Sequence, residues 1–292
     1  MKFEKGATEF LEYKKSYIKF RTYERYISLI PRITQFFGNI DIEKISTKDL
    51  QTFIKWLSEE KKLSNSSIKI HIMFLKSVIC YFDADKKFNK LFFPKEKKKN
   101  IKVYTDEEIV KIKKYIFEED HLQNCLGELI AIYTGMRLGE ILALQWSDIH
   151  FNEGFINVSK SIYRRKNEGM IIASPKALAS YRQIPLHPKL KEVLRKFRSH
   201  CVSDYVVGAN EGKKIKSFRT LQAHNEKMCE KIGVESKGMH AYRHYFATHL
   251  IKRTNQVKLV SECLGHSNIL ITQNIYNNPS LDDKKKMLEF LE

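Results

Sequence analysis

The stretch FFPKEKKKNIKVYTDEE, residues 92–108, divides this chain of 292 residues into two parts. Pro94 and the lysine run that follows it are typical of a solvated linker, and they equally suit a segment lying along a polyanion backbone. The TDEE that ends the stretch is a capping box, in which the Thr105 hydroxyl and the Glu108 carboxylate each accept from the other's free backbone amide. We therefore expect one folded unit before this stretch and a second unit that begins at Thr105.

The part that precedes the linker is expected to be helical throughout. In FEKGATEFLEYKKSYIKF, TYERYISLIPRITQFFG and SIKIHIMFLKSVICYF, apolar residues recur at intervals of three and four, which predicts amphipathic helices. A further helix in STKDLQTFIKWLSEE has Ser46 or Thr47 as its N-cap. Pro31 is expected to kink or break the second helix. The pattern predicts a small unit of about four helices.

The part that follows the linker mixes helices with short strands. Helices run from Thr105 to about Leu144, and helices resume at Pro188. Between them GFINVSKS, GMIIASP and YRQIPLH are short, rich in Ile and Val and separated by turn-prone residues, which indicates a small antiparallel sheet. The fold class is therefore mainly α with a small antiparallel β-sheet. The chain is expected to divide into a helical domain over 1–93, a basic linker over 94–104, an α+β domain over 105–277 and a tail helix over 278–292.

The net charge gives the first indication of function. Lys and Arg number 52 against 34 Asp and Glu, a formal charge of +18. Residues 1–100 hold 22 basic and 12 acidic side chains and the remainder holds 30 and 22, so the surplus is spread over both parts. A spread surplus suits a protein that contacts a nucleic acid along its length, although a lysine-rich protein without such a partner has the same composition.

Several classes of protein are disfavoured by the composition. We find no run of about 18 apolar residues, so no membrane span is expected. The start MKFEKGATEF lacks the apolar region of a signal peptide. The five cysteines are scattered without a CxxC pair, which is typical of reduced thiols. These features predict a cytoplasmic protein.

The first stretch with candidate functional residues is YTGMRLGEILALQW, residues 133–146. Glycines at 135 and 139 mark a helix start, and they place Arg137 and Glu140 three residues apart on one face. An arginine held by a carboxylate near a helix N-terminus is a good clamp for a phosphate oxygen. An ordinary surface ion pair has the same spacing and is far commoner.

The second stretch is HAYRHYFATHL, residues 240–250, in which His240 and Arg243 share a helix face. The histidines at 240 and 244 have the spacing of a zinc helix, but Ala241 stands where a metalloprotease needs glutamate. No third ligand and no carboxylate cluster for magnesium accompany them. We therefore expect neither a metal ion nor a cofactor, and packing or capping remains an alternative role for these histidines.

Three further side chains complete the inventory: Lys176 in IIASPKALASYRQIPL, and His266 and Tyr276 in LGHSNILITQNIYN. A cluster of cations with a tyrosine suits metal-free attack of the tyrosine on a phosphodiester, because arginines can spread positive charge over the non-bridging oxygens. The tyrosine, whose free pKa is about 10, needs a base or nearby cations to ionise, and the leaving 5′ oxygen needs a general acid. Lys176 can equally be a solvated lysine, and Tyr276 can simply pack.

The order and wording of these motifs resemble those of the tyrosine recombinase (phage integrase) family. TGMRLGE, then PK in a strand turn, then HAYRHYFATHL, then LGHSNILITQNIY occur in the family's order over residues 105–277. The helical residues 1–92 look like that family's core-binding domain. The resemblance implies a two-domain C-clamp, with a helical core-binding domain and an α+β catalytic domain.

The resemblance also implies a role for each matching residue. Arg137 and Arg243 match the two arginines that bind the scissile phosphate, and Glu140 matches an acidic partner that steadies the site. His240 matches a proton acceptor or phosphate ligand, and His266 matches a residue that hydrogen-bonds the phosphate. Lys176 matches the hairpin lysine that acts as general acid, and Lys166 is a lesser candidate for that role. Tyr276 matches the nucleophile that forms a 3′-phosphotyrosyl bond.

The resemblance further implies the assembly and the substrate. Four protomers act on two DNA duplexes that carry inverted-repeat core sites, and strands are exchanged through a Holliday junction, with a directionality factor as a candidate accessory partner. The tail after Tyr276 either folds back or docks on a neighbouring protomer. No arm-site domain is visible, which suits an Xer-like recombinase or a trimmed chain, whereas QNIYN is more like mobile-element integrases. The alternatives are a type IB topoisomerase-like nicking-closing enzyme, a non-catalytic DNA-binding regulator and an RNA-binding protein.

Overall fold

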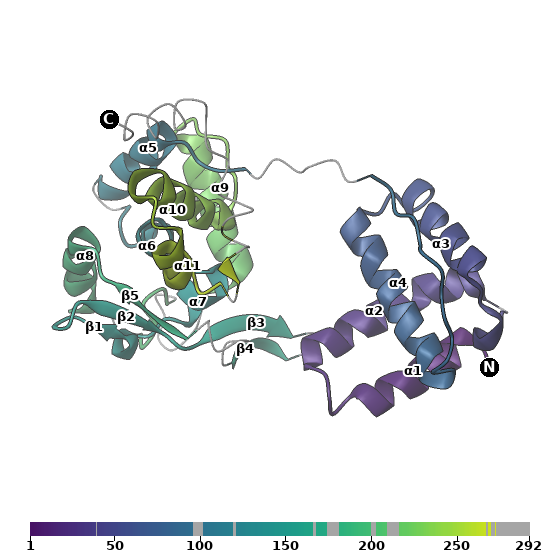
Figure 1. Cartoon of the computed structure of the whole chain (residues 1–292). Helices are drawn as coiled ribbons and strands as arrows, with labels where there is room; N and C mark the ends of the chain where they lie inside the picture. The colour runs from purple at the N-terminus through teal and green to yellow at the C-terminus, as the bar shows by residue number, and fades with distance from the viewer. Residues whose placement is uncertain are drawn as a thin grey trace, which may run out of the picture. The chain divides into compact units, whose positions relative to one another are not determined.

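The computed structural model describes residues 1–38, 40–95, 102–118, 121–165, 168–173, 181–199, 203–208, 216–266, 268–269 and 272. The chain forms two compact units, Met1–Asn100 and Ile101–Glu292 (Figure 1). Each unit has its own buried apolar core. No helix among the described residues is long and apolar enough to cross a membrane.

The first unit is a helical bundle, as the apolar periodicity predicts. Its elements are α1 (Phe3–Lys14), α2 (Phe20–Phe37), a 3-10 turn (Ile42–Lys44), α3 (Thr47–Glu59) and α4 (Asn65–Phe82). Ser46 is the N-cap of α3, and its hydroxyl accepts from the backbone amide of Asp49, whose carboxylate accepts from the Ser46 amide. Rings from all four helices fill the core, where Phe74 of α4 stacks with Tyr26 of α2 at 4.6 Å between centroids.

A kink or a break was expected at Pro31, and the break does not occur, because α2 continues from Phe20 to Phe37. Proline removes the hydrogen bond to the carbonyl four residues earlier, here that of Ile27. Both Pro31 and Ile27 are exposed, so water can bond that carbonyl and the helix loses little.

The second unit begins with the expected capping box. Glu108 donates its backbone amide to the Thr105 hydroxyl at 3.2 Å, and its carboxylate accepts from the Thr105 amide at 2.8 Å. The helices that follow are α5 (Asp106–Phe117), α6 (Leu126–Thr134) and α7 (Leu138–Ala143), then a 3-10 turn (Trp146–Asp148). After the strands come α8 (Pro188–Arg198), α9 (Phe218–Lys231), α10 (Met239–Thr254) and α11 (Val257–Leu264).

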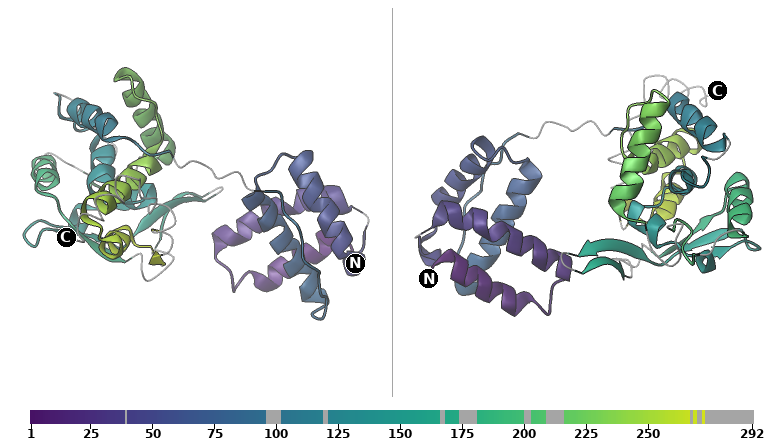
Figure 2. Two further views of the ribbon diagram at one scale, coloured as in Figure 1. Left: turned by 45° about the horizontal axis from the view of Figure 1, so that its top comes forward. Right: turned by 180° about the vertical axis from the view of Figure 1, so that it is seen from behind.

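The strands are antiparallel, as predicted, but they form two sheets instead of one. β1 (Ile149–His150), β2 (Phe155–Val158) and β5 (Arg182–Pro185) make one sheet in that order, and β3 (Ser161–Arg165) pairs with β4 (Gly169–Ala173) in the other. The segment 154–161, expected as one strand, is interrupted where Lys160 pairs with Asp148 at 3.0 Å. The β3–β4 pair projects from the helices of this unit (Figures 1 and 2).

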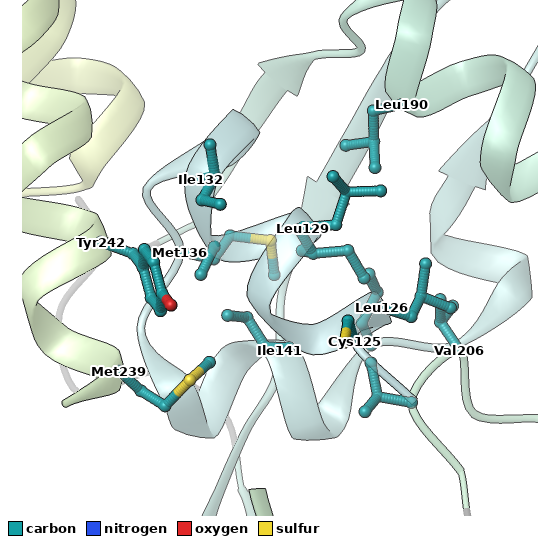
Figure 3. Close-up of a cluster of buried hydrophobic side chains, with 14 of the residues drawn as sticks. Cys125, Leu126, Leu129, Ile132, Met136, Ile141, Leu190, Val206, Met239 and Tyr242 are labelled. Atoms are coloured by element: carbon teal, nitrogen blue, oxygen red, sulfur yellow. The ribbon is translucent and has the colours of Figure 1, made fainter. Parts of the chain in front are cut away.

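The core of the second unit lies around α6. In Figure 3, Tyr242 and Met239 of α10 point toward Met136 and Ile141, and all four side chains are buried. The Tyr242 hydroxyl donates to the Asn225 side chain of α9 at 2.7 Å. Packing between α6 and α10 therefore sets the position of the segments that lead into α7 and α11, where the candidate site residues lie.

Candidate active site

Three arginines from three different elements converge on the C-terminal end of α11. Each donates to one of three consecutive backbone carbonyls. Arg182 Nε donates to the Cys263 carbonyl at 2.5 Å, Arg243 Nη2 to the Leu264 carbonyl at 2.8 Å, and Arg137 Nη2 to the Gly265 carbonyl at 3.1 Å. We call this arrangement the α11 clamp.

The end of a helix is a favourable place for such cations. The last carbonyls of an α-helix have no partner within the helix, and the helix dipole leaves partial negative charge there. Gly265 adopts the left-handed conformation that ends α11, with φ of 65°. The chain therefore turns at the clamp, and His266 follows it directly.

Arg137 and Glu140 form the ion pair that their spacing predicts. Arg137 is the residue before the first turn of α7, and its Nη1 lies 2.8 Å from Glu140 Oε1. The Glu140 carboxylate also accepts from the backbone amide of Arg137 at 2.9 Å. The Arg137 side chain is 37% exposed, so its guanidinium remains accessible to a ligand.

Glu140 is a buried carboxylate between two arginines. Its side chain is 3% exposed, and Oε2 lies 2.8 Å from Nη2 of Arg182, on β5. Burial acts to raise the pKa of this carboxyl, but the hydrogen bond and charge of Arg182, with those of Arg137, outweigh it and hold the pKa below its ordinary value. Glu140 is therefore an anion that holds both guanidinium groups.

Arg243 is buried on α10 and is held by backbone carbonyls. Its Nη1 donates to the Gly135 carbonyl at 2.8 Å and its Nη2 to the Leu264 carbonyl. The residue is 2% exposed. Since a guanidinium carries five N–H groups in a fixed fork, one arginine can hold backbone carbonyls and an oxyanion at the same time.

His240 and His244 are neighbours on α10, with ring centroids 4.7 Å apart. Loss of hydration lowers the pKa of His240, and the charges of Arg243 and Arg137 lower it further. Burial, with His240 and Arg243, lowers the pKa of His244 to about 4. Both rings are therefore neutral at pH 7, and His240 is the more exposed of the two.

His266 is oriented by a hydroxyl. Its Nδ1 lies 2.8 Å from Oγ1 of Thr272, which is fully buried. Burial lowers the pKa of His266 to about 4, and the charges of the three clamp arginines and of His240 contribute. At pH 7 this ring is neutral, so one nitrogen donates and the other accepts.

The structure thus brings together Arg137, Glu140, Arg243 and His266. The charges of the two arginines also lower the pKa of His240. Lys176 and Tyr276, with Lys166 and the tail over 278–292, lie outside the described residues. Sequence reasoning missed Arg182. The signal that could have found it is an arginine at the start of the expected strand YRQIPLH. If that side of the strand is buried, the charged side chain needs a partner of opposite charge or a hydrogen-bond acceptor.

The arrangement suits an anion with several oxygens. Clustered guanidinium donors recognise phosphate groups and stabilise negative charge that develops on them. Among the described residues, no group of three or more His, Cys, Asp and Glu side chains is placed to hold a metal ion.

Comparison with known proteins identifies the family. Residues 102–282 match the Phage integrase family, and residues 2–58 match the Phage integrase N-terminal SAM-like domain. The chain belongs to the phage integrase family. By family it is a tyrosine recombinase, the class of enzyme that breaks and rejoins DNA strands at specific sites. The topoisomerase-like and regulatory alternatives are not favoured.

The relatives and solved structures agree with this assignment. A XerC-like tyrosine recombinase of Caldanaerobacter subterraneus subsp. tengcongensis is 34% identical over 221 residues, which are 68% of this chain but only 56% of that relative. A fragment of the Tn1549 transposon integrase, in complex with a circular intermediate DNA, has a TM-score of 0.84 at 19% identity, with 100% of both chains covered. A lambda integrase tetramer bound to a Holliday junction has a TM-score of 0.68 at 18% identity, with 94% of this chain and 77% of that chain covered. The expected fold class is confirmed.

Proposed function

We propose that this integrase cleaves DNA with Tyr276, forms a 3′-phosphotyrosyl bond, and exchanges strands through a Holliday junction. The observation that carries the proposal is the α11 clamp: two of its arginines and His266 are the residues that the family's motifs select as phosphate ligands. The clamp ends at Gly265, and Tyr276 follows in the next segment of the chain.

Arg137 is the proposed principal ligand of the scissile phosphate, because it is the more exposed of the two arginines that pair with Glu140. Arg243 is proposed to add N–H donors from the same guanidinium that holds Gly135 and Leu264. A pentavalent transition state places extra negative charge on the non-bridging oxygens, and donors already fixed in place stabilise that charge without reorganisation. Removing one such donor typically slows the reaction by about 10²–10³-fold.

The proton transfers need a base for the tyrosine and an acid for the 5′ oxygen. Neutral His240 is available as the proton acceptor or as a further phosphate ligand, and neutral His266 as a hydrogen-bond donor to the phosphate. Lys176 is the proposed general acid for the departing 5′-hydroxyl. The phosphotyrosyl bond conserves the energy of the broken phosphodiester, so rejoining to a new 5′-hydroxyl needs no ATP.

The proposed partner is double-stranded DNA with inverted-repeat core sites, bound by four protomers on two duplexes. Residues 1–93 are the proposed core-type DNA-binding domain, 105–277 the catalytic domain and 278–292 a tail helix that docks on a neighbouring protomer. Both domains are basic, which favours contact with the phosphate backbone by each. We propose α4 and α9 as the groove-contacting helices, and an accessory directionality factor and a nucleoid location as further features.

The deciding experiment uses a suicide DNA substrate, nicked so that the 5′-hydroxyl fragment diffuses away after cleavage. The substrate pool is drawn from the source genome, EDTA is present, and the product is a covalent protein–DNA band. The wild type and Tyr17→Phe are expected to give the band, and Tyr276→Phe is expected to give none. Tyr17 is the matched control because it is an exposed tyrosine, far from the motifs in sequence.

Two outcomes would count against the proposal. A band that persists in Tyr276→Phe would reassign the nucleophile. Absence of a band in the wild type, with DNA binding intact over the whole pool, would favour a DNA-binding regulator.

A further inference from the structure

Arg182 is one of two buried members of the α11 clamp, the other being Arg243. Its side chain is 5% exposed, against 37% for Arg137. All three nitrogens of the Arg182 guanidinium donate within the protein, Nε to Cys263 and both Nη atoms to Glu140, whereas Arg137 is open to a ligand. The two arginines that share the Glu140 carboxylate are therefore expected to act differently.

Arg182 forms a bridge between three elements of the second unit. Nη1 and Nη2 lie 3.2 and 2.8 Å from the two oxygens of Glu140, on α7, and Nε donates to the Cys263 carbonyl, on α11. The residue itself lies on β5, paired with Val158 of β2. One planar fork thus fixes the distance between the helix that carries Arg137 and the helix end that precedes His266.

The charge balance explains why the bridge matters. Glu140 is buried, and a buried carboxylate without sufficient cationic partners is costly. With Arg182 in place, one oxygen of Glu140 lies against Arg137 Nη1 and the other against Arg182 Nη2, so the carboxylate holds Arg137 at a defined position. Without Arg182, the Glu140 charge would be balanced by Arg137 alone, which would draw that guanidinium inward from the accessible side.

We infer that Arg182 is a positioning residue for strand cleavage: it aims Arg137 through Glu140 and ties that pair to the α11 end that carries His266. It acts without touching the DNA. This inference rests on the proposed function of the α11 clamp.

The test is a double-mutant cycle on the suicide-substrate cleavage rate, measured in a single turnover at saturating protein. Arg182→Gln is expected to slow cleavage about 10²-fold, the effect of a displacement of about 1 Å in a catalytic group. DNA affinity should stay within about threefold of the wild type, because Arg182 makes no DNA contact. A purely structural loss would lower affinity and cleavage together.

The second arm of the cycle examines the coupling to Glu140. Glu140→Gln should also slow cleavage about 10²-fold, and the double variant should be no slower than either single variant, because both buried charges are then removed together. Independent roles would multiply to about 10⁴-fold. Arg182→Lys keeps the positive charge and should recover part of the cleavage rate. It keeps the test interpretable if Arg182→Gln fails to fold.

Arg195→Gln is the matched control. Arg195 lies on α8 over the Phe151 ring at 5.8 Å, outside the clamp, and its loss should leave the rate unchanged. The inference is overturned if Arg182→Gln cleaves at the wild-type rate, if the double variant shows multiplied defects, or if affinity falls with the rate. Failure of the wild type to cleave would instead contradict the proposed function.

Discussion

At the scale of single residues, the contact between His266 and Thr272 decides which nitrogen of the imidazole carries the proton. The ring is neutral at pH 7 because burial and neighbouring arginines lower its pKa to about 4. If the Thr272 hydroxyl donates to Nδ1, the proton resides on Nε2, which is the donor that the proposed function requires of this ring.

Thr272→Val removes the hydroxyl and keeps the shape of the side chain. We expect cleavage to fall about tenfold, the equivalent of about one lost hydrogen bond, because the two tautomers of His266 become comparable. The measurement is single-turnover cleavage of the suicide substrate. Thr254→Val is the control, since Thr254 donates to the Leu250 carbonyl at the end of α10. Equal rates for both variants would show that Thr272 does not set the tautomer.

The lowered histidine pKa values make stability depend on pH. His244 and His266 have a pKa of about 4 when folded, against an ordinary value of 6.5. Between pH 6.5 and 4 the unfolded chain binds protons that the folded chain does not, so the free energy of unfolding decreases as the pH falls through that window. Above this window these two groups contribute no pH dependence.

This pH dependence can be measured by urea unfolding at three pH values, one of them above the window and two within it. The midpoint should fall as the pH is lowered, and His244→Gln should reduce the fall because one group of the pair is removed. A midpoint that stays constant through the window would contradict the pKa directions.

At the scale of elements, Gly135 connects the packing of α6, α10 and α11 to the clamp. It ends α6 in the left-handed conformation, with φ of 62°, and its carbonyl accepts from Arg243. A Cβ on Gly135 would lie 2.6 Å from the Phe246 ring and 3.0 Å from Leu264. Only glycine therefore fits where these three helices meet.

Gly135→Ala is expected to lower the free energy of unfolding by about 1–3 kcal/mol, through backbone strain and the crowding of Phe246 and Leu264. Gly154→Ala is the matched control, because Gly154 has φ of 78° but a Cβ placed there would meet no atom within 4 Å. Gly154→Ala has only the cost of placing alanine in a left-handed conformation, so it should lower the free energy of unfolding by less than Gly135→Ala. Urea unfolding of both variants measures the difference, and equal losses would remove crowding from the explanation.

At the scale of the whole molecule, the two units have separate cores and differ in their sheet content. In the described part of the chain, the elements of the first unit are helices, and the strands lie in the second unit. Each unit also carries its own positive surplus. Stability and DNA affinity are therefore expected to divide between the units.

Expressed alone, residues 101–292 are expected to unfold in one cooperative thermal transition, because the clamp and its supporting core lie within this unit. The fragment should bind DNA with a shallower dependence of log K on log salt than the full chain, since it neutralises fewer phosphates. Circular dichroism and a salt titration of DNA binding measure these properties. A fragment without a cooperative transition would show that residues 1–100 are needed for its fold.

Local patterns in the sequence determined the helices, their caps and the Arg137–Glu140 pair. The capping boxes at Ser46 and Thr105 involve residues three apart, and so does the ion pair, so the order of residues alone specifies which groups can meet. The motif order was also sufficient to identify the family, whereas the roles of Lys176 and Tyr276 stay predictions.

Only the tertiary structure decided that Arg182 belongs with Glu140 and that three arginines share the end of α11. Arg182 is 42 residues from Glu140 and 81 from Cys263. It also decided that the strands divide between two sheets and that α2 continues through Pro31. The physical reason is that contacts between distant residues depend on how helices and strands pack and on which side of a helix faces water, and no short stretch of sequence specifies either.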